Sequence, residues 1–182
     1  MKKIVLLISI LILTACSFSI DDIDNTPTKQ VEKYLNSYQS LDKGVISDLD
    51  IVVERETNFN LEQKNRYRIL MKKNFQNMSY TIKEETVNGD SAEVDVEISV
   101  YDYYKVNKQA DNYLLENKDE FIKDGVYNEE RFIDYKLDKM SKNTDKVKYT
   151  IYFNLSKDNN GDWRLDEVSE ADEEKILGIY QY

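Results

Sequence analysis

The sequence predicts an α+β fold in which several N-terminal helices precede antiparallel strands. Apolar residues recur every three or four positions between residues 31 and 78, the period of helices buried on one face. Over residues 92–100 and 149–155 the apolar residues alternate instead, the period of half-buried strands. A helical pattern separates these two strands. We therefore expect residues 26–182 to form one α+β domain with a helical insertion between two β-hairpins.

The first sixteen residues, MKKIVLLISILILTAC, have the layout of an export signal, with two lysines before a short apolar run. The run from Ile4 to Leu13 is about half the length of the roughly 20 apolar residues that a membrane-spanning helix needs. Cys16 is the only cysteine of the chain and so has no disulfide partner within it. The segment Leu13-Thr14-Ala15-Cys16 resembles the lipobox of bacterial lipoproteins.

This resemblance implies that residues 1–15 are a cleaved lipoprotein signal peptide and that Cys16 is lipidated. Residues 16–25 would then be a tether, and diacylglycerol on Cys16 would hold the chain on the extracytoplasmic face of the cell membrane. Two acyl chains anchor a protein stably, whereas one binds only marginally. The alternative is an ordinary secretory signal peptide that is cleaved without lipidation.

The charge of the expected mature chain argues against several partners. Residues 1–15 carry two lysines and no acidic residue, so 23 basic residues remain against 35 acidic ones, a net charge of −12. An acidic surface repels nucleic acid and anionic lipid, so we expect no nucleic-acid partner. The negative charge is compatible with a basic partner or a bound cation. With Cys16 lipidated no disulfide is available, and stability must come from the core.

Three helices are predicted before the first strand. Thr26 is a typical N-cap for the first helix, and Gly44 is expected at its C-cap position. Residues 45–53 form the expected second helix. Asn60, with Gln63 three residues later, predicts a capping box at the start of the third helix.

Strands and helices alternate in the rest of the chain. Asn88-Gly89 is a strong hairpin signal between residues 80–85 and the alternating strand 92–100. The following segment is helical again, with Asn128 as the cap of a second helix within it. Further elements are a strand over 148–155, a turn at 158–161, a returning strand over 163–165 and a closing helix over 171–180.

Two segments resemble the NTF2-like (cystatin-like) superfamily. They are the final strand, Asn160-Gly161-Asp162-Trp163-Arg164-Leu165, and the opening helix from Thr26 to Leu41. Together with the lipobox they resemble small lipoproteins of low-GC Gram-positive bacteria that carry an NTF2-like domain of unknown function. The resemblance implies a curved antiparallel sheet wrapped around helices as a cone with a pocket. The insertion, about residues 105–142, is longer than the usual connection and could fill or cap that pocket.

No motif predicts an enzyme. The sequence has no histidine, and lipidation would consume its only thiol, so the commonest general bases and transition-metal ligands are missing. Asp158-x-Asn160-x-Asp162 is similar to the start of a calcium loop, but Trp163 and Ser169 stand where an EF-hand needs Gly and Glu. We therefore expect a hairpin turn there, and neither a metal site nor a cofactor.

Tyr101, Tyr103 and Tyr104, at the end of the best strand, are the candidate ligand or partner surface. Exposed tyrosines suit recognition because each joins a rigid apolar ring to a polar tip. The alternative is that these rings border the core, as we expect for Trp163.

These observations favour a non-enzymatic, membrane-anchored module that binds a small ligand or an envelope protein. One alternative is a carboxylate-dependent enzyme in an NTF2-like pocket, which would require an acidic side chain inside a buried cavity. The other is a surface immunity or inhibitor-type protein, which the acidic charge supports.

Overall fold

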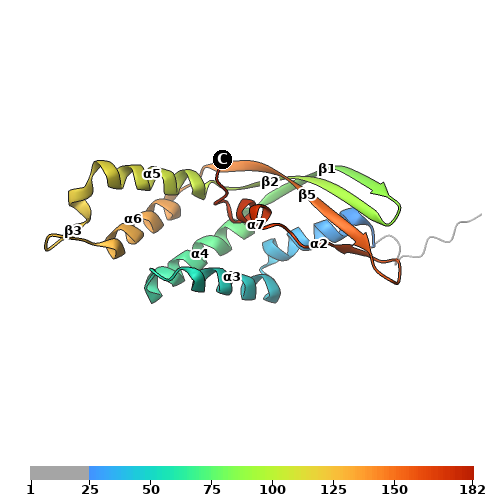
Figure 1. The fold of residues 1–182 in the computed structure, drawn as a ribbon, viewed down its shortest axis with the longest axis horizontal. Coiled ribbons are helices and arrows are strands. Elements are labelled where there is room, and N and C mark those ends of the chain that lie inside the picture. The colour runs from blue at the N-terminus through green and yellow to red at the C-terminus, as the bar shows by residue number, and fades with distance from the viewer. Residues whose placement is uncertain (1–24) are drawn as a thin grey trace, which may run out of the picture.

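The computed structural model describes residues 25–182, so the expected signal peptide and the lipidation site Cys16 lie outside the described residues. Figure 1 shows an elongated molecule with a body and an arm. The body consists of a sheet and the helices α2 (Pro27–Ser40), α3 (Lys43–Arg55), α4 (Leu61–Asn77) and α7 (Glu170–Leu177). The arm consists of α5 (Tyr103–Glu116) and α6 (Glu129–Lys142). They are joined by a 3₁₀ turn (Lys118–Phe121) and a small hairpin of β3 (Ile122–Lys123) and β4 (Val126–Tyr127).

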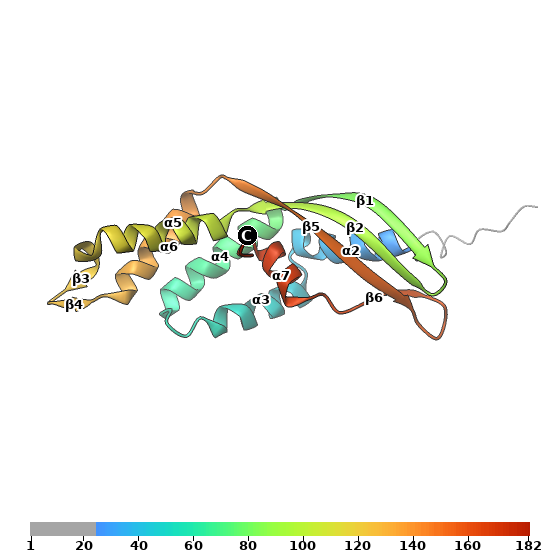
Figure 2. The same cartoon turned by 45° about the horizontal axis from the view of Figure 1, so that its top comes forward.

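The sheet of the body has four antiparallel strands in the order β1-β2-β5-β6. They are β1 (Ser79–Asn88), β2 (Ser91–Tyr101), β5 (Lys146–Lys157) and β6 (Trp163–Leu165). Both predicted hairpins are present, and the arm lies between them in the sequence. Figure 2 shows that the long strands bend over the helices, so the expected α+β fold with a curved antiparallel sheet is confirmed.

The core lies between the sheet and the helices on one of its faces. Every second residue of β2, from Ala92 to Val100, is buried, as the alternation predicts. The inward residues of β5 are also buried and pack in the same cluster as Leu35 of α2 and Met71 of α4. The arm packs mainly on α4 and on a small core of its own, made by Ala110, Phe121 and Phe132. The insertion therefore extends away from the sheet.

The helix caps follow the sequence with one correction. Thr26 caps α2, and Asn60 and Gln63 form the predicted capping box of α4. Gly44 is not a C-cap, because α2 already ends at Ser40 with Leu41 as its C-cap, and Gly44 lies inside α3. Leu41 adopts the left-handed conformation with φ 57°, its amide donates to the carbonyl of Tyr38, and its side chain packs against the body core. These contacts offset the strain that a non-glycine residue has in this conformation.

Two other boundaries differ from the predictions. The hairpin of β3 and β4 was not expected, although Asp124-Gly125 is a typical two-residue turn and both residues have positive φ. The closing helix α7 ends at Leu177 and not at residue 180, because Gly178 adopts φ 75° and caps it.

None of the helices in residues 25–182 is long and apolar enough to cross a bilayer.

Asn74 is a fully buried polar residue that joins three elements of the body. It lies on α4, its Nδ2 donates to the carbonyl of Ile176 in α7 at 2.9 Å, and its Oδ1 accepts from the amide of Tyr101 in β2 at 2.9 Å. Both partners are backbone groups near the base of the arm. They would lose their hydrogen bonds without this side chain.

Replacing Asn74 by alanine should lower the free energy of unfolding by about 3 kcal/mol, because a buried N–H and a buried C=O lose their partner. Urea-induced unfolding followed by circular dichroism measures the change. Asn77→Ala on the same helix is the matched control, since Asn77 is exposed and its Nδ2 donates only to Lys73, one turn away. Equal losses for both variants would contradict the bridging role of Asn74.

Candidate functional site

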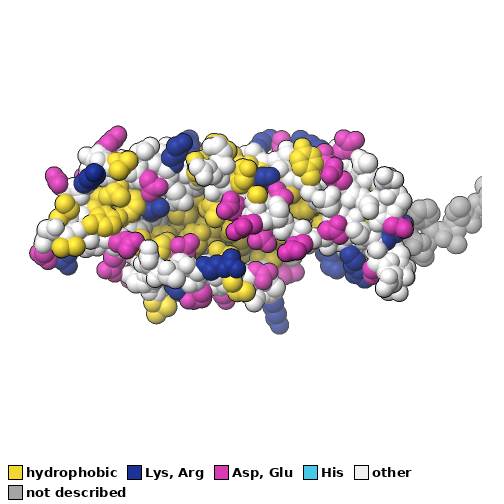
Figure 3. All heavy atoms as spheres, viewed as in Figure 1, with side chains coloured by type: hydrophobic (Ala, Val, Ile, Leu, Met, Phe, Trp, Pro, Cys, Tyr) yellow, Lys and Arg dark blue, Asp and Glu magenta, His cyan; other side chains and the backbone are white. Residues whose placement is uncertain are grey.

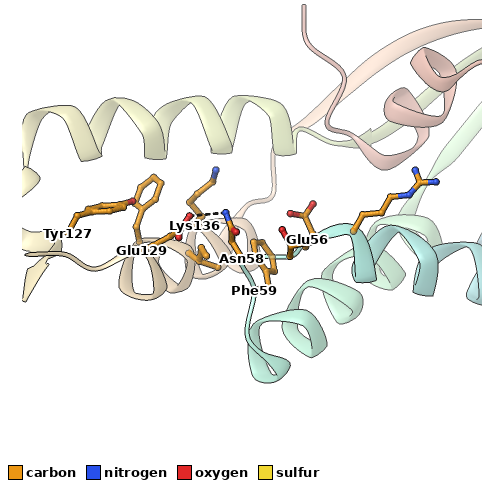
Figure 4. Close-up of a pocket in the computed structure, with 10 residues that line it drawn as sticks. Glu56, Asn58, Phe59, Tyr127, Glu129 and Lys136 are labelled. Carbon is orange, nitrogen blue, oxygen red and sulfur yellow. Dashed lines mark hydrogen bonds between the residues drawn. The ribbon is translucent and has the colours of Figure 1, made fainter.

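A cleft of about 290 Å³ lies where the arm leaves the body, and we call it the arm cleft. One wall is the loop between α3 and α4, and the other is the start of the second arm helix (Figure 4). Ligand pockets in proteins begin at about this size. The lining residues are Arg55, Glu56, Thr57, Asn58, Phe59, Tyr127, Glu129, Phe132, Ile133 and Lys136.

The loop wall is short and held by backbone hydrogen bonds. The amide of Thr57 donates to the carbonyl of Arg55 at 2.9 Å, and the amide of Phe59 donates to that of Glu56 at 3.2 Å. The capping box at Asn60 then starts α4 directly. The five successive residues 55–59 thereby line the cleft from a defined turn.

Polar side chains of α4 and its preceding loop tie the two walls together. Asn58 donates to the carboxylate of Glu129 at 3.0 Å, as the dashed line in Figure 4 shows, and Asn60 donates to that of Glu130 at 2.6 Å. Gln63 is almost fully buried and donates both to the carbonyl of Glu130, at 2.9 Å, and to Asp134, at 3.1 Å. A network of this kind fixes the arm relative to the body.

The arm cleft combines a mostly polar lining, with charges of both signs, and some apolar surface. Phe59, Phe132 and Ile133 supply apolar surface. Lys136 stands 5.5 Å above the Phe132 ring and 3.4 Å from the Asp111 carboxylate. The remaining charged lining residues are Arg55, Glu56 and Glu129. This arrangement fits a small molecule with an apolar body and a polar or zwitterionic end.

Of the three tyrosines predicted as a binding surface, the structure removes Tyr103 from the surface and leaves Tyr101 and Tyr104 partly exposed. Tyr103 is 1% exposed, and its hydroxyl donates to the carbonyl of Leu70, so it belongs to the core. Burial raises the pKa of that hydroxyl far above its ordinary value. Tyr101 is half-buried, with the ammonium groups of Lys73 and Lys146 near its ring, and Tyr104 packs against Tyr182. Trp163 is buried, as expected.

The loop at Asp158 is a hairpin turn held by its own backbone. The Asp158 carboxylate accepts from the amides of Asn160, at 2.8 Å, and Asp162, at 3.1 Å, and it pairs with Arg164 at 3.0 Å. The Asn160 amide and the Arg164 guanidinium lower the pKa of Asp158. Throughout residues 25–182 no group of three or more acidic side chains is placed to hold a metal ion.

Sequence reasoning singled out none of the residues that line the arm cleft. Its walls are about 70 residues apart in the chain, as the spacing of Asn58 and Glu129 shows. The one local signal is Phe59, an aromatic residue in a polar loop immediately before a helix cap. That signal indicates a buried or ligand-facing ring but says nothing about the wall opposite.

Comparison with known proteins yields little. No protein-family model matches the chain, and no curated protein sequence matches it. Among solved structures, the presumed lipoprotein YcdA of Bacillus subtilis is similar, with 12% sequence identity and a TM-score of 0.44. The superposition covers 90% of this chain and 51% of that protein, so the chain spans about half its length.

Proposed function

We propose that this chain is an extracytoplasmic lipoprotein, anchored to the cell membrane through diacylglycerol on Cys16, that binds a small ligand in the arm cleft without catalysing a reaction. The observation that carries the binding proposal is the arm cleft itself. Its lining joins charged residues with apolar surface from Phe59, Phe132 and Ile133, and its two walls are held in place by the hydrogen bonds of Asn58, Asn60 and Gln63.

The anchor proposal rests on the lipobox-like segment that ends at Cys16. The described part of the chain supports a tether that ends at Asn25. The Oδ1 of Asn25 accepts from the amide of Trp163 at 3.0 Å, and its Nδ2 donates to Asp162. Asn25 thus holds the start of α2 at the end of the body far from the arm (Figure 1). The arm cleft lies toward the other end of the molecule from Asn25, where a tether to Cys16 would begin.

A purely binding role is supported by the side chains of the arm cleft. Proton transfer would fall to a carboxylate, since the sequence has no histidine, and catalytic carboxylates are usually tuned by burial. Glu129 is exposed and accepts from Asn58, whereas Glu56 is half-buried in the loop. Neither is enclosed in a cavity.

We also propose that the body is a variant of the NTF2-like fold. Support comes from the N-terminal helices on one face of the curved sheet and from the final strand at Trp163. The arm is an addition to that plan. It neither fills nor caps the inner face of the sheet, where α2, α4 and α7 pack.

Replacing Cys16 by alanine tests the anchor. The variant should lose incorporation of radiolabelled fatty acid and should leave the membrane fraction, because no other residue of the sequence can carry the thioether. Ser17→Ala is the control and should stay labelled and membrane-bound. A Cys16→Ala variant that remains labelled would refute the lipoprotein assignment.

The ligand proposal is tested with L-phenylalanine and diphenylalanine as zwitterionic probes, followed by NMR chemical shifts of the mature chain. Shifts should cluster at the lining residues and disappear in Thr57→Trp, which fills the arm cleft. Thr86→Trp, on the exposed strand β1, should leave them unchanged. Shifts spread over the surface, or retained in Thr57→Trp, would contradict a ligand site there.

A further inference from the structure

Exposed apolar side chains gather at the outer end of the arm, over residues 115–130, which we call the arm tip. Ten large hydrophobic residues are exposed in the described chain, and four of them lie in this short segment. They are Leu115, Ile122, Val126 and Tyr127, with 41 to 69% of their surface accessible. Figure 3 shows hydrophobic side chains at this end of the molecule with acidic ones around them. Paired strand residues share a face and successive residues alternate, so Ile122 and Tyr127 lie on one face of the small hairpin and Val126 on the other. A partner that encloses the hairpin would contact both faces, and exposed apolar surface of this kind is typical of interaction sites.

The arm tip is held rigidly in its exposed position. Ile122 pairs with Tyr127 across the small hairpin, and the amide of Asn128 donates to the carbonyl of Phe121 at 2.7 Å. Phe121 is buried beneath the hairpin against Phe132, with ring centroids 5.3 Å apart. A partner therefore meets a preformed surface, and little conformational entropy is lost on docking.

The negative charge of the arm tip indicates the kind of surface that it would bind. Residues 115–130 hold six carboxylates and two lysines, a net charge of −4. In the described structure the exposed carboxylates of Glu116, Asp119 and Asp124 make no hydrogen bond or ion pair with another side chain. Acidic side chains that border an apolar patch favour a basic surface opposite them.

We propose that the arm tip docks a protein whose surface has an apolar recess bordered by lysines and arginines. A second copy of this chain fits poorly, because two arm tips would each bring a charge of −4. An anionic membrane repels the same charge. This partner site goes beyond the small-ligand function proposed for the arm cleft, and it uses Ile122 and Val126, which do not line that cleft.

Two synthetic amphipathic peptides test the proposal, one of leucine and lysine and one of leucine and glutamate, titrated into the mature chain by fluorescence anisotropy. The leucine–lysine peptide should bind. The double variant Ile122→Ser with Val126→Ser should weaken it by about tenfold, since two apolar anchors are lost. Glu116→Gln with Asp124→Asn should weaken it as well, and most clearly at low salt.

Matched control variants carry comparable substitutions elsewhere on the surface. Ile69→Ser with Val87→Ser removes equally exposed apolar residues, and Glu84→Gln with Glu93→Gln removes exposed charges of the sheet. Both should bind the peptide as the parent chain does. Equal weakening by the controls, or equal binding of the leucine–glutamate peptide, would overturn the proposal. So would arm-tip-dependent dimers in sedimentation or arm-tip-dependent binding to phosphatidylglycerol vesicles. The chemical shifts that L-phenylalanine causes at the arm cleft should be the same in the arm-tip variants as in the parent chain. Each proposal can therefore be refuted without the other.

Discussion

Replacing Gly178 by alanine should lower the free energy of unfolding by at least about 3 kcal/mol, because the new methyl group has no room and the backbone is in a conformation that side chains disfavour. Gly178 has φ +75°, and a Cβ added there would lie 2.1 Å from the carbonyl oxygen of Tyr101. That oxygen cannot easily move. The amide of Tyr101 is held by Asn74, and the carbonyl of Gly178 accepts from the amide of Tyr104 at 2.9 Å.

The variant Gly161→Ala separates the cost of the lack of room from the cost of the backbone conformation. Gly161 has φ +85° but no atom within 4 Å of the added Cβ, so only the conformational cost of about 1 to 2 kcal/mol applies. Urea unfolding of both variants measures the difference. If Gly178→Ala lost no more stability than Gly161→Ala, the close approach of α7 to the end of β2 would not contribute as argued.

Raising the pH above about 10 should unfold the protein in one cooperative step. Burial is the main cause that raises the pKa of the Tyr34, Tyr67, Tyr103 and Tyr149 hydroxyls well above the ordinary value. In the unfolded chain these hydroxyls ionise near pH 10, while in the folded chain they keep their protons. Above that pH the unfolded state binds fewer protons, so stability is full below pH 10 and falls as the pH rises. Each hydroxyl that keeps its proton in the folded chain steepens this fall by at most about 1.4 kcal/mol per pH unit.

The near-ultraviolet absorbance of tyrosinate and the far-ultraviolet circular dichroism, recorded on one sample, check this result. The rise in absorbance from the buried tyrosines should coincide with the loss of helix signal. Tyr67→Phe keeps the ring contact with Phe59, 5.7 Å away, but removes one ionising group, so its slope above pH 10 should be smaller by up to about 1.4 kcal/mol per pH unit. Ionisation of all tyrosines before the helix signal falls would contradict their burial.

Local signals predicted the elements of this fold well because each depends on neighbours in the sequence. The capping box of Asn60 and Gln63 and the alternation along β2 need only a few residues to act. The prediction that Gly44 is the C-cap of α2 was wrong because Leu41 adopts the left-handed conformation in its place. Contacts between Leu41 and the body core stabilise that conformation. A sequence pattern contains no information of that kind.

The candidate sites were harder to predict because they depend on how distant segments meet. Tyr103 was expected near a surface, but β2 ends at Tyr101 and α5 begins at Tyr103, with Asp102 capping the helix through the amide of Lys105. The period changes there from two residues to 3.6, which turns Tyr103 inward. The arm cleft likewise exists only because α6 docks on α4.

The hydrogen bonds of Asn25 have a consequence for the order in which the chain can fold. Asn25 and Trp163 are 138 positions apart, and α2 packs beside β6. In a chain that crosses the membrane from its N-terminus, as we propose, α2 can pack on α4 and β2 once these have emerged, but its contacts with β6 must wait for residues 163–165. Closing so long a loop is slow, and the waiting segments are open to proteolysis and misassociation. For the exported lipoprotein that we propose, we therefore expect the yield of folded protein to depend on how soon residues 163–165 follow α2 across the membrane.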